Sequence, residues 1–271
     1  RDGGHVSFRV HRALAVTWKE ALDLRKNPGL LASMLALPAV LVLVPTGVVW
    51  AWLRHPDTVT FRSMALYYDS TLPLNADPVR FMVDKLVIDW FGIFLLMPVF
   101  VPILISSQSV AGEKERRTLE PLLAAPVSAS ELVLGKSLAS VVPAVAITWL
   151  SFAVFVAAVD AVAWPLVHGP VLPNGMWLFG VGVVAPLFAF LGNGLAVLVS
   201  ARVGEARLAQ QLSALVVLPL MGLVGGQLAG WIRAGTGYYA VQGAVVLVLD
   251  ILLVRASVRL FDRERLVSRW T

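Results

Sequence analysis

Six apolar runs, each about as long as a membrane-spanning helix, divide the chain. A run of about 20 apolar residues crosses a hydrocarbon core of ~30 Å. The runs cover approximately Leu30–Leu53, Val87–Ser107, Leu138–Val159, Met176–Val199, a stretch from Leu212 onward, and Tyr239–Val254. The period-two alternation typical of a membrane β-barrel is absent from the sequence. The pattern therefore predicts an all-α, polytopic membrane protein with six transmembrane helices.

Prolines and glycines interrupt two of these runs. Pro98 and Pro102 are expected to kink the second span, because proline removes a helical hydrogen bond. Pro219 and several glycines break the fifth run, and the glycine-rich stretch 222–238 precedes the sixth. This stretch is interpreted either as a short re-entrant element or as glycines that permit close helix packing.

The segment before the first span has amphipathic helical periodicity. Val10, Leu14, Trp18 and Leu22 recur every four residues from Val6 to Lys26, among basic residues. This pattern favours a helix lying in the membrane interface. We therefore divide the chain into an interfacial helix over 1–29 and a six-span domain over 30–271. A polar outside loop is expected over 54–86.

A charged insert over 111–137 separates the second and third spans. From Gly112 to Glu120, seven of the nine residues are charged or hydroxylic, although only 14% of the whole chain is charged. Thr118 is expected to cap one short helix that ends at Pro126, and Ser128 with Glu131 forms a capping-box pattern for a second. The acidic residues and an apolar face favour a docking element over a solvated loop.

The distribution of basic residues predicts the orientation. Of the 22 Lys and Arg residues, 17 lie in the N-terminal segment, the insert, the turn over 200–211 and the C-terminal tail. The positive-inside rule therefore places these segments and both termini in the cytoplasm. The net charge of +5 is consistent with topology and lipid contacts, so no nucleic-acid partner is expected.

The sequence shows no catalytic or metal-binding constellation. The absence of cysteine excludes thiolate chemistry. Gly135-Lys136-Ser137 resembles the end of a phosphate-binding loop, but Ser130 stands where that loop requires glycine. Within the expected spans, the ionisable residues are Asp250 and Asp89, each close to an expected span end. We therefore expect a non-catalytic chain without a metal site.

Four polar residues in the later spans are candidates for a transport pathway: Asn193, Gln227, Gln242 and Asp250. Each of them could instead form a hydrogen bond between helices. The sequence leaves both roles open.

The insert also carries a family resemblance. The run Ser109-Val-Ala-Gly-Glu-Lys-Glu-Arg-Arg-Thr-Leu-Glu-Pro-Leu-Leu-Ala-Ala-Pro-Val-Ser128, followed by Glu131-Leu-Val-Leu-Gly-Lys136, resembles the signature of type-2 ABC transporter permeases. These are membrane subunits of prokaryotic ABC exporters. The resemblance implies a multi-pass protein of the cytoplasmic (inner) membrane and a second permease subunit, identical or different. It also implies a separate cytoplasmic ATPase that binds ATP and Mg.

By the same resemblance, the insert is the coupling helix that contacts the ATPase. The residues expected at that contact are Glu113, Lys114, Glu115, Arg116, Arg117, Thr118, Leu119 and Glu120. The alternative hypothesis is an ABC-linked mechanical or assembly protein that acts on an extracytoplasmic partner through the loop 54–86.

Overall fold

A computed structural model describes residues 10–54, 57–115, 128–203 and 205–267, and these residues form helices joined by loops. Six helical stretches are long and apolar enough to cross a membrane: Pro28–Trp52, Pro78–Gln108, Ser130–Val167, Gly175–Arg202, Ala206–Leu228 and Thr236–Leu260. The predicted all-α class with six spans is therefore confirmed.

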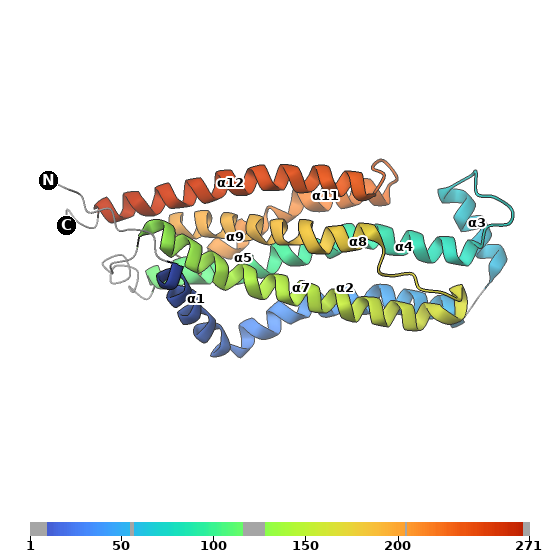
Figure 1. The fold of residues 1–271 in the computed structure, drawn as a ribbon, viewed down its shortest axis with the longest axis horizontal. Coiled ribbons are helices and arrows are strands. Elements are labelled where there is room, and N and C mark those ends of the chain that lie inside the picture. Colours follow the sequence, from blue (N-terminus) through green and yellow to red (C-terminus); the bar gives the residue numbers. More distant parts are fainter. Residues whose placement is uncertain (1–9, 55–56, 116–127, 204, 268–271) are drawn as a thin grey trace.

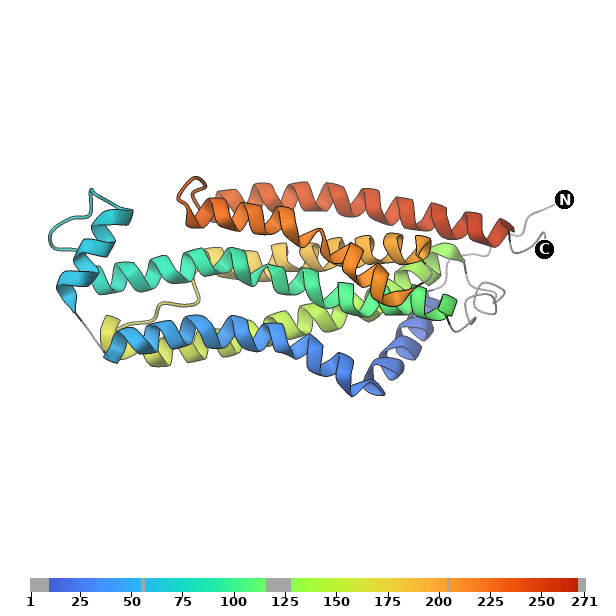
Figure 2. The same ribbon diagram turned by 180° about the vertical axis from the view of Figure 1, so that it is seen from behind.

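The spans form an elongated bundle in which α1 and α3 mark opposite ends (Figure 1). The helices are α1 (Val10–Arg25), α2 (Pro28–Arg54), α3 (Thr58–Tyr68), α4 (Pro78–Phe94), α5 (Leu96–Glu115), α7 (Ala129–Val167), α8 (Gly175–Phe179), the π-helix η1 (Gly180–Val184), α9 (Ala185–Arg202), α10 (Ala206–Ala214), α11 (Val217–Leu228) and α12 (Thr236–Val267). The end of α5, the start of α7 and the end of α12 lie near α1. Seen from behind, α4 and α5 run between α2 and α11 (Figure 2).

Helix α9 contacts α5, α7 and α12. Two glycines on α9 let α5 and α12 approach it closely. A Cβ atom on Gly192 would collide with the backbone of Val99 in α5. One on Gly194 would lie 2.9 Å from Leu253 in α12. Glycines on two sides of one helix therefore position α5 and α12 against it.

A cluster of buried aromatic residues fixes the half of the bundle nearer α3. Trp177 is fully buried and stacks on Phe152 with ring centroids 5.4 Å apart and planes within 8°. Phe91, Phe94 and Phe155 also surround Trp177, at centroid distances of 4.7–5.2 Å. The indole nitrogen of Trp177 donates a hydrogen bond to the carbonyl of Val87 (3.3 Å), so its polar atom is satisfied inside the core.

The second span begins at Pro78, which corrects the expected start at Val87 and shortens the outside loop predicted over 54–86. Asp77 caps the helix by accepting hydrogen bonds from the backbone N–H groups of residues 79 and 80, with proline in the first turn. The charged residues that suggested a loop form i,i+4 pairs on the helix, namely Arg80 with Asp84 and Lys85 with Asp89. Part of the remaining loop folds into α3.

Two helix breaks lie about four residues before a proline, where the carbonyl group loses its usual N–H donor. Helix α4 ends at Phe94, whose carbonyl would have bonded to the nitrogen of Pro98, so the interruption predicted at Pro98 is confirmed. Pro102, also predicted to kink the span, lies within the continuous helix α5. Likewise α10 and α11 are separated at residues 215–216, four residues before Pro219.

The sixth span is longer than predicted, and this changes the position of Asp250. The sequence suggested Tyr239–Val254, whereas the apolar helix extends over Thr236–Leu260. Asp250 is therefore ten residues, roughly 15 Å, from the nearer end of this span rather than close to it. Residues 229–235 between α11 and α12 form a turn and contain no re-entrant helix.

Candidate functional site

Both ends of the charged insert are fixed in helices. Glu113, Lys114 and Glu115 lie in the last turn of α5. The remaining predicted coupling residues lie outside the described residues, as does the helix expected from Thr118; they are Arg116, Arg117, Thr118, Leu119 and Glu120. After the insert, the predicted capping box is confirmed. The Ser128 hydroxyl accepts a hydrogen bond from the Glu131 N–H (3.2 Å), and the Ser128 N–H donates to the Glu131 carboxylate (2.7 Å).

Helix α1 packs on the beginning of α7, directly beside the insert. The hydroxyl of Thr17 donates a hydrogen bond to the carbonyl of Gly135 (3.0 Å). Val16 is buried in a small apolar cluster with residues of α7 and α9. Three residues of the predicted apolar row are exposed on α1: Leu14, Trp18 and Leu22 are 53%, 68% and 38% exposed. These side chains are available to the membrane interface.

Asn193 connects α5, α7 and α9 near the same end of the bundle. Its side-chain carbonyl accepts hydrogen bonds from Ser106 and Ser140, each 2.8 Å long, and its amide nitrogen donates to Ser137 (2.8 Å). All four side chains are buried. Of the two roles left open by the sequence, the structure shows Asn193 in a helix–helix hydrogen-bond network.

Gln227 also makes a contact between helices. It is buried, and its side-chain carbonyl accepts a hydrogen bond from the hydroxyl of Tyr239 (3.3 Å). A Cβ atom on Gly92 would clash with this carbonyl oxygen, so the glycine makes room for Gln227 between α4 and α11.

Helix α12 differs from the other spans, because it carries unpartnered polar atoms along its buried side. Among the described residues, the buried side-chain atoms without a hydrogen-bond partner are all on α12: Tyr238 Oη, Gln242 Oε1, both carboxylate oxygens of Asp250, and Ser257 Oγ. Asp250 is only 6% exposed. Gln242 and Asp250 therefore differ from Asn193 and Gln227, whose side chains are satisfied within the chain.

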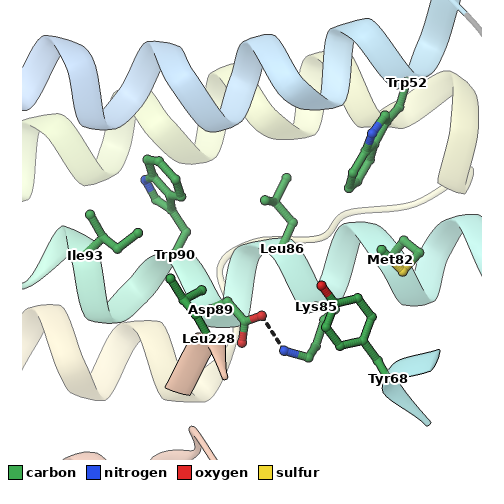
Figure 3. Close-up of a pocket in the computed structure, with 9 residues that line it drawn as sticks. All are labelled: Trp52, Tyr68, Met82, Lys85, Leu86, Asp89, Trp90, Ile93 and Leu228. Carbon is green, nitrogen blue, oxygen red and sulfur yellow. Dashed lines mark hydrogen bonds and ion pairs between the residues drawn. The ribbon is translucent and has the colours of Figure 1, made fainter. Parts of the chain in front are cut away.

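A pocket with both polar and apolar walls lies along α4, between α2, α3 and α11 (Figure 3). Its volume is about 250 Å³, and α2, α3, α4 and α11 contribute to its lining. The lining residues are Trp52, Tyr68, Met82, Lys85, Leu86, Asp89, Trp90, Ile93 and Leu228. Lys85 and Asp89 form an ion pair, and the Lys85 ammonium lies 4.9 Å from the centroid of the Tyr68 ring. Trp90 is held by a hydrogen bond from its indole N–H to the Leu41 carbonyl (2.8 Å).

This pocket was not predicted from the sequence, because Lys85 was expected to lie in the outside loop 54–86. The signal was nevertheless present in the sequence. A lysine and an aspartate four residues apart, followed directly by Trp90, indicate an ion pair on a helix beside an aromatic residue. Trp52 and Leu228 belong to distant segments, and no local pattern relates them to Lys85.

Comparison with known proteins gives one family. The family model described as "ABC-2 family transporter protein" matches residues 14–261, which include all six spans and both ends of the insert. No curated protein matches the chain.

Proposed function

Because the chain belongs to the ABC-2 transporter family and is a permease subunit of an ABC transporter, we propose that it couples ATP hydrolysis on a separate cytoplasmic ATPase to substrate export. The observation that supports the coupling role is that the charged insert is continuous with two membrane-spanning helices, α5 and α7. The insert over 111–137 begins in the last turns of α5 and ends in the first turns of α7, a helix of 39 residues whose first turn is fixed by a capping box.

A displacement of the insert by an ATPase would be transmitted to several spans. Helix α7 contacts α2, α5 and α9, and α1 is hydrogen-bonded to its first turns. A rigid element joined to packed helices converts a local movement into movement of the bundle. The proposed ATPase-contacting residues are those from Glu113 to Glu120, and ATP with Mg would bind to the ATPase subunit.

Two residues of α12 are the proposed pathway residues. Gln242 and Asp250 have buried polar atoms without a partner among the described residues, and such groups within a span commonly mark a transport path. A second permease subunit, identical or different, would complete that path. Asn193 and Gln227 would then hold the helices around it.

Charge reversal at the insert tests the coupling role. We expect the double variant Glu113→Lys, Glu115→Lys to weaken ATPase binding roughly tenfold or more, because it places like charges at a complementary surface. The measurements are copurification with the ATPase and substrate-stimulated ATP hydrolysis in proteoliposomes. Arg233→Glu is the control, because Arg233 is exposed in the turn between α11 and α12. That turn lies at the end of α12 away from the insert (Figure 1). Unchanged ATPase binding by the double variant would contradict the proposal.

One feature favours the alternative, an ABC-linked mechanical or assembly protein. The segment around α3 exposes Val59 (76%), Tyr67 (86%) and Leu74 (96%), and Arg62 orders it by donating hydrogen bonds to the carbonyls of Leu72 and Pro73. An ordered apolar surface suits a protein partner. If this alternative holds, Tyr67→Ser with Leu74→Ser abolishes function without changing ATPase binding. Normal function of that variant would rule it out.

A further inference from the structure

The pocket of Figure 3 has a polar half and an apolar half. Lys85, Asp89 and Tyr68 lie on one side of α4, whereas Leu86 and Trp90 lie on the side that faces Trp52 of α2. This division follows from the helical positions, because Lys85 and Asp89 are one turn apart, as are Leu86 and Trp90. A ligand that fills both halves is amphipathic.

The polar half already holds an ammonium group. Lys85 is paired with Asp89, and its nitrogen also lies over the Tyr68 ring. The two charged side chains are only 28% and 17% exposed. A carboxylate together with an aromatic face is the arrangement by which proteins bind alkylammonium ligands.

The position of the pocket relates it to the membrane surface. Trp52 is the last residue of the first span and Leu228 the last of the fifth, so both belong at the level of the lipid headgroups. From Lys85 to Ile93 the lining continues for roughly 12 Å along α4. The volume of about 250 Å³ is smaller than the roughly 300–1,000 Å³ of sites that enclose a whole small molecule. It suits a headgroup whose chains stay in the bilayer.

We propose that this pocket binds a phosphate–ammonium zwitterion, the headgroup chemistry of phosphatidylethanolamine and phosphatidylcholine. The ligand ammonium takes the place of the Lys85 nitrogen between Asp89 and the Tyr68 ring, and Lys85 turns to the phosphate. Every charge is paired before and after this exchange. A purely anionic headgroup would take Lys85 and leave the Asp89 carboxylate without a cation, which is costly for a largely shielded charge.

Lipid retention tests this proposal without the ATPase, so the result is independent of the proposed coupling. The full chain is reconstituted in nanodiscs containing equal parts of phosphatidylethanolamine, phosphatidylcholine and phosphatidylglycerol, then released and analysed by native mass spectrometry. We expect the two ammonium-bearing lipids to be retained about fivefold over phosphatidylglycerol, which corresponds to roughly 1 kcal/mol. Equal retention of the three lipids, or no retained lipid, would overturn the proposal.

Charge variants distinguish binding of a zwitterionic headgroup from electrostatic attraction of an anionic lipid to Lys85. Asp89→Asn leaves a net positive pocket and should reverse the preference toward phosphatidylglycerol. The double variant Lys85→Asp, Asp89→Lys keeps one charge of each sign and should keep the preference. The matched control is Asp84→Asn, since Arg80 and Asp84 form an i,i+4 pair on the same helix outside the pocket, 45% and 43% exposed. A change in the control as large as that in Asp89→Asn would contradict the assignment.

Competition with soluble headgroups distinguishes an intact lipid from a free zwitterion. Glycerophosphoethanolamine at millimolar concentration displaces the retained lipid if the headgroup alone supplies the binding energy. If glycerophosphoethanolamine fails to displace the lipid, binding of the ammonium-bearing lipids also depends on contacts with the apolar half of the pocket. In that case Trp90→Ala should abolish retention, and a Trp90→Ala variant that still retains lipid would exclude the apolar half as part of the site.

Discussion

Asn193 illustrates how a single polar residue joins spans inside an apolar bundle. It accepts hydrogen bonds from serines on α5 and α7 and donates one to a further serine on α7, and all of these groups are buried. Hydrogen bonds of this kind between membrane helices contribute about 0.6 kcal/mol on average and up to about 1.7.

We therefore expect Asn193→Leu to lower the free energy of unfolding by about 1–2 kcal/mol. Gln242→Leu is the matched control, because Gln242 Oε1 has no partner within the described part of the chain. Unfolding of purified protein in mixed micelles, titrated with denaturing detergent, measures both variants. Equal stability of the two would argue against Asn193 as a helix-joining residue.

Replacing Asp250 should have the opposite effect on stability to replacing Asn193, and it should also abolish transport. Its carboxylate is buried near the middle of the sixth span, with no hydrogen bond to any described residue. Replacing an unsatisfied buried polar group by an apolar one of similar size removes a cost of about 1–3 kcal/mol. Asp250→Leu is therefore expected to be more stable than the wild type and to lose transport in proteoliposomes. A stable variant with normal transport would remove Asp250 from the pathway.

At the scale of helices, the contact between α5 and α9 depends on Gly192. A Cβ atom there would collide with the Val99 backbone, which cannot move as a flexible side chain could. Gly192→Ala should destabilise the protein by about 1–3 kcal/mol through overpacking. Gly222→Ala is the control, since a Cβ atom at that helical position meets nothing within 4 Å. Unfolding free energies that are equal for the two variants would contradict this packing.

The first turn of α3 and the turn that follows the helix are expected to fray in acid, because a carboxylate holds each of them by hydrogen bonds. Hydrogen bonds from the Thr60 hydroxyl and the Val59 N–H hold the pKa of Asp57 below its ordinary value. The hydroxyl and N–H of Thr71 do the same for Asp69. A depressed pKa contributes stability above the unfolded value of about 4, and this contribution is lost as the pH falls through the folded value.

Hydrogen exchange at the Val59 and Thr71 amides measures this fraying. Corrected for intrinsic rates, protection should be high at pH 6 and reduced at pH 3. Asp57→Asn should remove the pH dependence at Val59 while Thr71 keeps it. Protection that is the same at both pH values in the unmodified chain would show that the two carboxylates do not stabilise the first turn of α3 and the turn that follows it.

Hydropathy predicted the existence of the six spans but not all of their ends. Long apolar runs identify α2, α7 and α9 directly. The first turns of α4 contain Arg80, Asp84, Lys85 and Asp89, which lower hydropathy although they are compatible with a helix through i,i+4 pairing. The start of the second span was therefore misplaced, because its charged residues pair within the helix. The third and sixth spans also extend beyond their predicted ends, over Ser130–Val167 and Thr236–Leu260.

The candidate residues show a second limit of the sequence. Asn193 and Asp250 look alike in sequence, as single polar residues in apolar runs. One is satisfied by serines 53 to 87 residues away and the other has no such partner. Only the tertiary structure distinguishes these cases, because the hydrogen-bond partners come from other helices.

For the whole molecule, the decisive property is orientation in the membrane. Helix α1 and the ends of α5, α7 and α12 that border the insert and the C-terminal tail lie at one end of the bundle, and α3 lies at the other (Figure 1). The concentration of basic residues predicts that the first end is cytoplasmic. An ATPase can reach the insert only in that orientation.

Single cysteines can test this orientation directly, because the chain contains no cysteine of its own. Leu74→Cys and Trp231→Cys introduce thiols at positions 96% and 86% exposed near the α3 end, and Lys26→Cys introduces one beside α1. A membrane-impermeant maleimide should label the first two in right-side-out vesicles and the third only in inside-out vesicles. The reverse pattern would place the insert outside the cell. It would also exclude coupling to a cytoplasmic ATPase, whatever the effect of charge reversal at Glu113 and Glu115.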